Sequence, residues 1–201
     1  MPLSERVFNY LLGASLIYWG IAGVLHEGGL DDLPLARIAT TALNFTVGLL
    51  IIIRKPVETQ GSMQSILLSI PSLICGGLLF KLSHPFAAWS LGFNALFIIG
   101  TTITIFSFIN LGQSFAILPA RRKIKTVGCY QLLRHPAYLG ELIMVSICFI
   151  SNVYWLTIAL FILFVTGLYF RIKTEEKLLF TSKAYSEYAQ KVKWRLIPFV
   201  W

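Results

Sequence analysis

One polar stretch, residues 134–141, lies between two strongly apolar segments and carries groups suited to chemistry. Pro136 disfavours helical backbone at His135 and is itself well suited to the first position of a helix, so the chain should turn at His135 and a helix should begin at Pro136. The start of a helix has unpaired backbone N–H groups, here at Ala137 and Tyr138 among others, and the positive end of the helix dipole. The turn therefore fits a carboxylate or phosphate ligand, and it equally fits a well-capped helix start without a ligand.

A second polar cluster, Arg171 with Glu175 and Glu176, follows the last apolar segment. Arg171 and Glu175 are one helical turn apart and share a face. The last two apolar segments are separated only by residues 151–153, which predicts an antiparallel helical hairpin that returns this face to the side of His135. Together the two clusters predict a pocket at the membrane surface. Taken alone, the second cluster is equally typical of a surface ion pair worth a few tenths of a kcal/mol.

The composition is that of an integral membrane protein. Of the 201 residues, 56% are hydrophobic and 13% charged, and the mean hydropathy is +0.73, whereas a water-soluble domain has about a quarter charged residues. We predict an all-α polytopic fold with about six transmembrane helices, the last two forming the hairpin. The predicted spans are 8–25, 38–53, 65–82, 86–111, 136–150 and 154–170. From residue 171 onward the chain is polar, and Leu178, Tyr185, Tyr188 and Val192 fall near one face of a predicted amphipathic C-terminal helix.

The basic residues predict the orientation. With six spans, fifteen of the 17 Lys and Arg residues fall on the side of both termini, and Arg37 and Lys81 fall on the other. By the positive-inside rule the termini, the central loop and the tail face the cytoplasm, in the inner or plasma membrane of a prokaryote or the endoplasmic reticulum of a eukaryote. The net charge of +8 thus reflects membrane topology and argues against a nucleic-acid partner. Residues 1–110 are predicted to form four N-terminal spans, and residues 111–201 a catalytic region.

Other kinds of site find little support. Cys75, Cys129 and Cys148 show neither a Cys-x-x-Cys pair nor metal-ligand spacing, so we expect no disulfide framework and no metal centre. His26 and His84 are single loop residues. The central basic residues are individually typical of contacts with lipid headgroups, so membrane lipids are expected partners.

Five ordered motifs between Leu111 and the C-terminus resemble the isoprenylcysteine carboxyl methyltransferase family. In chain order they are Leu111-Gly112-x-Ser114-Phe115, Lys125-Thr126-x-Gly128-x-Tyr130, Arg134-His135-Pro136-x-Tyr138-x-Gly140, Arg171-x-x-x-Glu175-Glu176-x-x-Leu179, and Tyr185-x-x-Tyr188 before Arg195-Leu196-Ile197-Pro198. The resemblance implies a multi-pass membrane enzyme that binds S-adenosylmethionine without a Rossmann domain. The implied acceptor is lipophilic and enters from the bilayer, with the carboxylate of an isoprenylcysteine or a similar molecule as the first choice.

The resemblance also assigns residues. It implies that Arg171 binds the acceptor and acts in catalysis, with Glu176 as a close supporting candidate. The implied cofactor-binding residues are Arg122, Lys123, Ile124, Lys125, Tyr130, His135, Pro136, Ala137, Tyr138 and Glu175.

The chemistry of methyl transfer fits these residue types. Displacement at a sulfonium has a neutral leaving group, so alignment of donor and nucleophile supplies much of the acceleration. A carboxylate acceptor is already ionised, and Arg171 can hold one of its oxygens by a charge-assisted hydrogen bond. An amine or thiol acceptor would need a base, and His135 or Glu176 would then take that role.

Two other functions remain open from the sequence. The stretch 134–141, with the later tyrosine pair and the basic ending, also resembles membrane sterol and steroid reductases that use NADPH, and Glu141 after Gly140 favours that pattern. The adjacent carboxylates of Glu175 and Glu176 argue against it, since a phosphate-rich dinucleotide would be repelled by them. The third function is that of a non-enzymatic membrane carrier or assembly protein.

Overall fold

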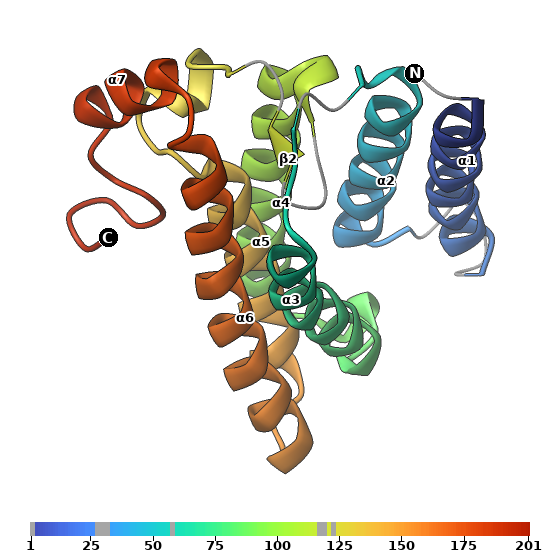
Figure 1. Cartoon of the computed structure of the whole chain (residues 1–201). Coiled ribbons are helices and arrows are strands. Elements are labelled where there is room, and N and C mark those ends of the chain that lie inside the picture. Colours follow the sequence, from blue (N-terminus) through green and yellow to red (C-terminus); the bar gives the residue numbers. More distant parts are fainter. Residues whose placement is uncertain (1–2, 27–32, 57–58, 116–119, 122–123) are drawn as a thin grey trace.

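The computed structural model describes residues 3–26, 33–56, 59–115, 120–121 and 124–201, and the described chain is almost entirely helical (Figure 1). This confirms the predicted all-α class. The helices are α1 (Leu3–His26), α2 (Leu35–Ile53), α3 (Met63–Leu82), α4 (Leu91–Leu111), α5 (Pro136–Ser151), α6 (Trp155–Leu179) and α7 (Lys183–Lys191). Three 3-10 turns, Phe86–Ala88, Gly112–Ser114 and Gly128–Gln131, lie between them. Two short antiparallel strands, β1 (Thr59–Gln60) and β2 (Ala120–Arg121), join the α2–α3 connection to the central loop.

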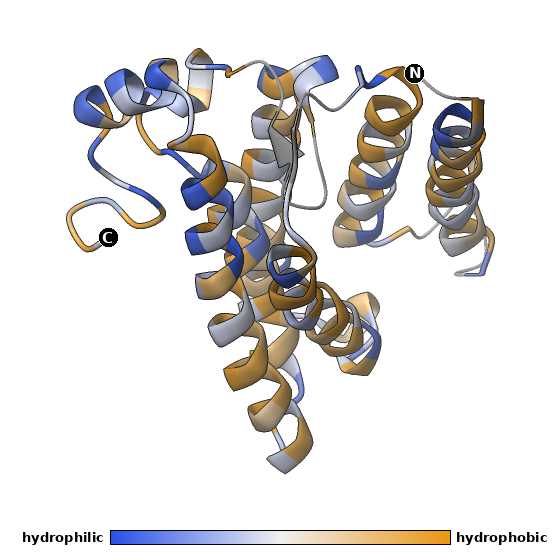
Figure 2. Ribbon diagram, in the orientation of Figure 1, coloured by the Kyte–Doolittle hydropathy of each residue, from blue (hydrophilic) through white to orange (hydrophobic). Residues whose placement is uncertain are grey.

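Five of the described helices, α1, α2, α3, α4 and α6, are long and apolar enough to cross a membrane. Their ribbons are mainly hydrophobic, whereas α7 is largely hydrophilic (Figure 2). Large apolar side chains such as Leu11, Trp155 and Ile162 are exposed, as expected for surfaces that face lipid. The fifth predicted span, α5, has 16 residues and is about 24 Å long at 1.5 Å per residue, which is shorter than a hydrocarbon core of about 30 Å.

Glycines allow each helix that carries a polar cluster to pack closely on a neighbouring helix. Gly140 of α5 packs on α4, where an added Cβ would collide with the carbonyl oxygen of Gly100 and the hydroxyl of Thr104. Gly167 of α6 packs on α3, where a Cβ would lie 2.7 Å from the backbone nitrogen of Ser72. Small residues at such crossings let helix backbones approach closely, which is a common way to stabilise helix pairs in membranes. These two crossings fix α5 and α6 against the rest of the bundle.

Substitution of Gly140 by valine is expected to destabilise the protein by about 1–3 kcal/mol, because the side chain would force α5 away from α4. The apparent melting temperature in detergent measures this effect. Gly77→Val is the matched control, since Gly77 is an exposed helical glycine whose added Cβ would meet nothing within 4 Å. Equal melting temperatures for the two variants would contradict the role of Gly140 in this contact.

Two predicted boundaries were wrong. The fourth span was placed at 86–111, but the chain first makes the 3-10 turn Phe86–Ala88, and the Ser90 hydroxyl accepts from the Phe93 N–H to cap α4 at Leu91. The sixth span was ended at residue 170, but α6 continues to Leu179 and carries the second polar cluster within it. The predicted apolar face of the tail is present in Tyr185, Tyr188 and Val192, whereas Leu178 belongs to α6.

Candidate functional site

The turn before α5 has the predicted geometry. His135 adopts φ −130° and ψ 56°, which lies outside the helical region, and Pro136 occupies the first turn of α5. One expected feature was wrong: the N–H of Tyr138 is not free, because it donates to the carbonyl oxygen of His135 at 3.1 Å. The helix therefore closes its first turn on its own cap residue, which reduces the number of amides that a ligand can use.

The C-terminal tail holds this turn in place. The N–H of Arg134 donates to the Trp194 carbonyl at 2.9 Å, and the N–H of His135 donates to the Arg195 carbonyl at 2.8 Å. The Tyr188 hydroxyl donates to the Tyr130 carbonyl at 2.6 Å. The turn is thus fixed by backbone and side-chain bonds from a segment about sixty residues later in the chain.

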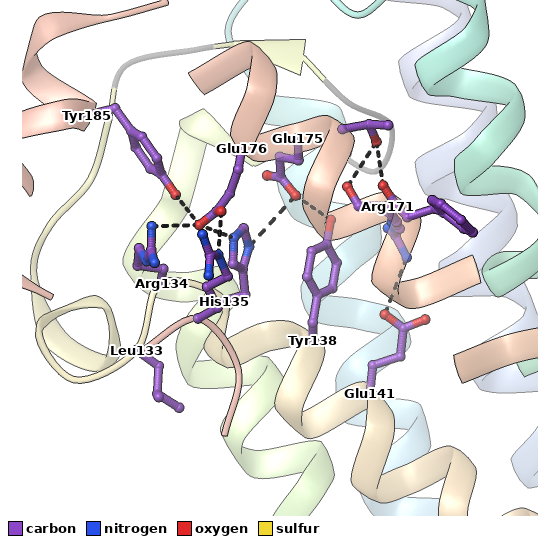
Figure 3. A network of polar contacts seen from close by, with 12 residues as sticks. Leu133, Arg134, His135, Tyr138, Glu141, Arg171, Glu175, Glu176 and Tyr185 are labelled. Atoms are coloured by element: carbon purple, nitrogen blue, oxygen red, sulfur yellow. Dashed lines mark hydrogen bonds and ion pairs between the residues drawn. The ribbon is translucent and has the colours of Figure 1, made fainter. Parts of the chain in front are cut away.

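Glu176 joins the turn, α6 and the tail through one buried carboxylate (Figure 3). Its side chain is only 4% exposed. Oε1 lies 2.8 Å from Arg134 Nη1 and accepts from the Tyr185 hydroxyl at 3.3 Å, and Oε2 lies 2.6 Å from Arg195 Nε. A carboxylate with two guanidinium partners is held in position, and such contacts are typical of a residue that positions others.

Glu175 points to the other side of the turn. Its Oε2 accepts a hydrogen bond from the Tyr138 hydroxyl at 2.6 Å and lies 3.9 Å from His135 Nδ1. The His135 ring stacks on Tyr138, and its Nε2 lies 3.5 Å from Oε1 of Glu176. The predicted meeting of the two polar clusters is therefore confirmed, with His135 between the two carboxylates.

Arg171 lies one turn before Glu175 in α6, on the side nearer the membrane-spanning part of the helix. Its Nη1 is 3.3 Å from Oε2 of Glu141 in α5, and its guanidinium lies over the Tyr138 ring at 4.7 Å from the centroid. Figure 3 shows the pair on the far side of Tyr138 from Glu176. The site thus has two polar levels, with the Arg171–Glu141 pair at the deeper one.

A cavity that is partly open to solvent lies at the upper level. Its lining combines aromatic, apolar and charged side chains. They are Leu111, Ser114, Ile124, Lys125, Tyr130, Arg134, His135, Ala137, Tyr138, Glu175, Leu179, Tyr185 and Tyr188.

The tyrosines outside the spans are neutral hydrogen-bond donors. Burial raises the pKa of Tyr130 above its usual range, and the charge of Glu175 raises it further. Burial likewise raises the pKa of Tyr185 and of Tyr188. Their hydroxyl groups therefore keep their protons at neutral pH, and the three side chains line the cavity.

The structure brings together most of the predicted cofactor residues. Seven of them line the cavity: Ile124, Lys125, Tyr130, His135, Ala137, Tyr138 and Glu175. Pro136 is buried beside them at the start of α5. Arg122 and Lys123 lie outside the described residues. Arg171 and Glu176 do not line the cavity, and Glu176 is enclosed by its partners.

Several contacts were not expected from the sequence. Glu141 was assigned only to the reductase pattern, yet it pairs with Arg171. Arg134 and Arg195 were quoted within motifs without a role, yet both hold Glu176. The spacing of Tyr185 and Tyr188 was a usable signal, since residues three apart on a helix share a face and both reach the cavity.

Comparison with known proteins gave a match at the level of a family. Residues 90–181 match the model of the isoprenylcysteine carboxyl methyltransferase (ICMT) family. No curated protein and no solved structure gave a significant match to the chain. The matched region runs from the cap of α4 to the end of α6 and includes the turn, both glutamates and Arg171. Residues 90–181 are thus similar to the isoprenylcysteine carboxyl methyltransferase family, and this similarity supports a membrane methyltransferase.

Proposed function

We propose that this protein transfers a methyl group from S-adenosylmethionine to a lipophilic acceptor that reaches the site from the bilayer. The observation that carries the proposal is the position of the cavity. It lies between the turn at His135 and the end of α6, and the Tyr138 ring that lines it also covers the guanidinium of the deeper Arg171–Glu141 pair. A water-soluble methyl donor would bind at the upper level, and an acceptor held in lipid would meet it from below.

The lining of the cavity suits the donor in its charges and aromatic rings. S-adenosylmethionine supplies an activated methyl group on a sulfonium and also carries an ammonium and a carboxylate. Glu175 is placed to bind a cationic part, and Tyr130, Tyr138 and Tyr185 offer aromatic faces to a cation or to a base. Lys125 and the N-terminal end of α5 at Ala137 suit the carboxylate.

The same proposal includes the topology. Six crossings, with α5 and α6 as the helical hairpin, place both termini, the cavity and α7 on the cytoplasmic side. The charge distribution supports this orientation, with fifteen of the 17 basic residues on that side. A cytoplasmic cavity would have direct access to the soluble methyl donor. The division into four N-terminal spans and a catalytic region from residue 111 stays a prediction.

The acceptor expected from the family is an isoprenylcysteine, whose carboxylate would be methylated. It is the reference acceptor for assays, because the guanidinium of Arg171 lies against Tyr138, which lines the cavity. Arg171 would bind the carboxylate, and the apolar chain would lie along the lipid-facing surfaces of the helices.

Calorimetric titration of the detergent-purified protein with S-adenosylmethionine, its demethylated product and NADPH tests the proposal. We expect the first two to bind and NADPH to give no heat, because Glu175 at the cavity repels additional phosphates. Binding of NADPH alone would indicate that the site is that of a reductase. Absence of binding by all three, in a protein with a cooperative melting transition, would favour a non-enzymatic role and contradict the proposal.

A further inference from the structure

The arginine assigned to the acceptor is already paired, and the more accessible member of the pair is the carboxylate. Glu141 Oε2 lies 3.3 Å from Arg171 Nη1, and the Glu141 side chain is 23% exposed against 6% for Arg171. The Tyr138 ring covers one face of the guanidinium. A lipophilic molecule that approaches α5 and α6 at this level therefore meets a carboxylate more readily than the guanidinium.

Glu141 also retains unused hydrogen-bonding capacity. Its Oε2 pairs with Arg171, whereas its Oε1 accepts no hydrogen bond from any residue that the structure describes. Glu141 lies five residues beyond Pro136 in α5, about 7.5 Å along the axis of a helix whose other residues are mainly apolar. A carboxylate oxygen in such surroundings is stabilised by an N–H or O–H donor and destabilised by a second carboxylate.

The local charge also favours a cation. Arg171 is close to two carboxylates, Glu141 at 3.3 Å and Glu175 one helical turn away on the same helix. Before the methyl donor binds, the group formed by these three side chains carries one net negative charge. An ammonium group complements that charge, whereas an acceptor carboxylate adds to it and competes with Glu141 for the guanidinium.

We propose that Glu141 selects a lipophilic primary amine as the methyl acceptor, which rests on the proposed function of the cavity. The ammonium group donates a hydrogen bond to Oε1 of Glu141 and then gives this carboxylate a proton. The freed nitrogen lone pair forms a bond to the methyl carbon of the donor, and the carbon–sulfur bond breaks with its electron pair remaining on sulfur. The products are a methylated ammonium and a neutral thioether, and Glu141 returns its proton to water.

The first test is the binding of hexadecylamine to the full-length protein in detergent, without methyl donor. Tryptophan fluorescence measures this binding. We expect Glu141→Gln to weaken binding by about tenfold, since it removes a charge-assisted hydrogen bond. Glu187→Gln, which alters an exposed glutamate on α7, should bind as the unchanged protein does and controls for partition into detergent. Equal binding by the two variants would overturn the proposal.

Turnover with methyl-labelled donor gives the second test, with hexadecylamine and N-acetyl-S-farnesylcysteine as acceptors. A methylamine product is stable to alkali, whereas a methyl ester releases methanol. We expect a higher kcat/KM for the amine, a loss of about 100-fold in Glu141→Gln for the amine, and a gain for the carboxylate. Preference of the unchanged protein for the carboxylate, equal losses for both acceptors, or no amine methylation by protein that binds the donor would overturn the proposal. Failure to bind the donor would instead contradict the proposed function.

Discussion

Replacement of Glu176 by alanine is expected to lower the free energy of unfolding by about 3 kcal/mol or more. The substitution leaves the buried guanidinium of Arg134 without its counter-charge and removes the 2.6 Å contact with Arg195 Nε. Removal of one member of a buried ion pair typically costs about 3–5 kcal/mol, because the remaining charge stays desolvated. For a protein of this size, that corresponds to a fall of about 6 °C or more in the apparent melting temperature in detergent.

Two variants make this result specific. Glu187→Ala on the exposed face of α7 should melt within about 1 °C of the unchanged protein, since exposed substitutions have small effects. Glu176→Gln keeps one acceptor oxygen but loses the charge, so its melting temperature should lie between those of the two alanine variants. A melting temperature for Glu176→Ala equal to that of Glu187→Ala would show that the network does not stabilise the fold.

The backbone around the site was largely predictable because local chemistry determines it. Pro136 excludes helical geometry at His135 and starts α5, whatever the rest of the chain does. The apolar runs are long enough to specify helices, and the three-residue gap before α6 leaves room only for a tight connection. These features follow from residues that are close in the sequence, so their prediction did not depend on knowing the fold.

The partners of the charged residues were not predictable, because they depend on contacts between distant segments. Glu176 pairs with Arg134, 42 residues earlier, and with Arg195, 19 residues later. Hydropathy placed the end of the last span at residue 170 because Arg171 and Glu176 are charged. Both side chains are buried among opposite charges and α6 continues past them, so the rule failed where polar pairs replace apolar packing.

One consequence is that the same hydrogen bonds and ion pairs stabilise the fold and hold the residues of the candidate site in position. The tail binds the backbone of Arg134 and His135 and also supplies Arg195 to Glu176. His135 in turn contacts both glutamates, one on the cavity side and one on the buried side. Substitutions at two neighbouring residues of α6 should therefore have different effects. Those at Glu176 should mainly lower stability, and those at Glu175 should mainly weaken ligand binding.

Substitution of Glu175 by alanine is accordingly expected to weaken S-adenosylmethionine binding by about 100-fold while changing the melting temperature little. Glu175 lines the cavity, and its side chain is 27% exposed. Its loss should therefore leave no buried charge unpaired, and it removes the hydrogen bond that the Tyr138 hydroxyl donates. A hydrogen bond to a charged ligand group contributes about 1.5–3 kcal/mol, and each 1.4 kcal/mol corresponds to about tenfold in Kd. Calorimetric titration measures the affinity.

Tyr138→Phe distinguishes what the Glu175 carboxylate itself contributes to donor binding from what its fixed orientation contributes. This variant keeps the ring that stacks on His135 and covers Arg171, but it removes the hydroxyl that donates to Glu175 at 2.6 Å. A carboxylate that is free to rotate should bind the donor about tenfold less tightly, a smaller loss than in Glu175→Ala. Unchanged affinity in both variants, with both proteins folded, would remove Glu175 from the donor site and leave the aromatic walls of the cavity as its main binding surface.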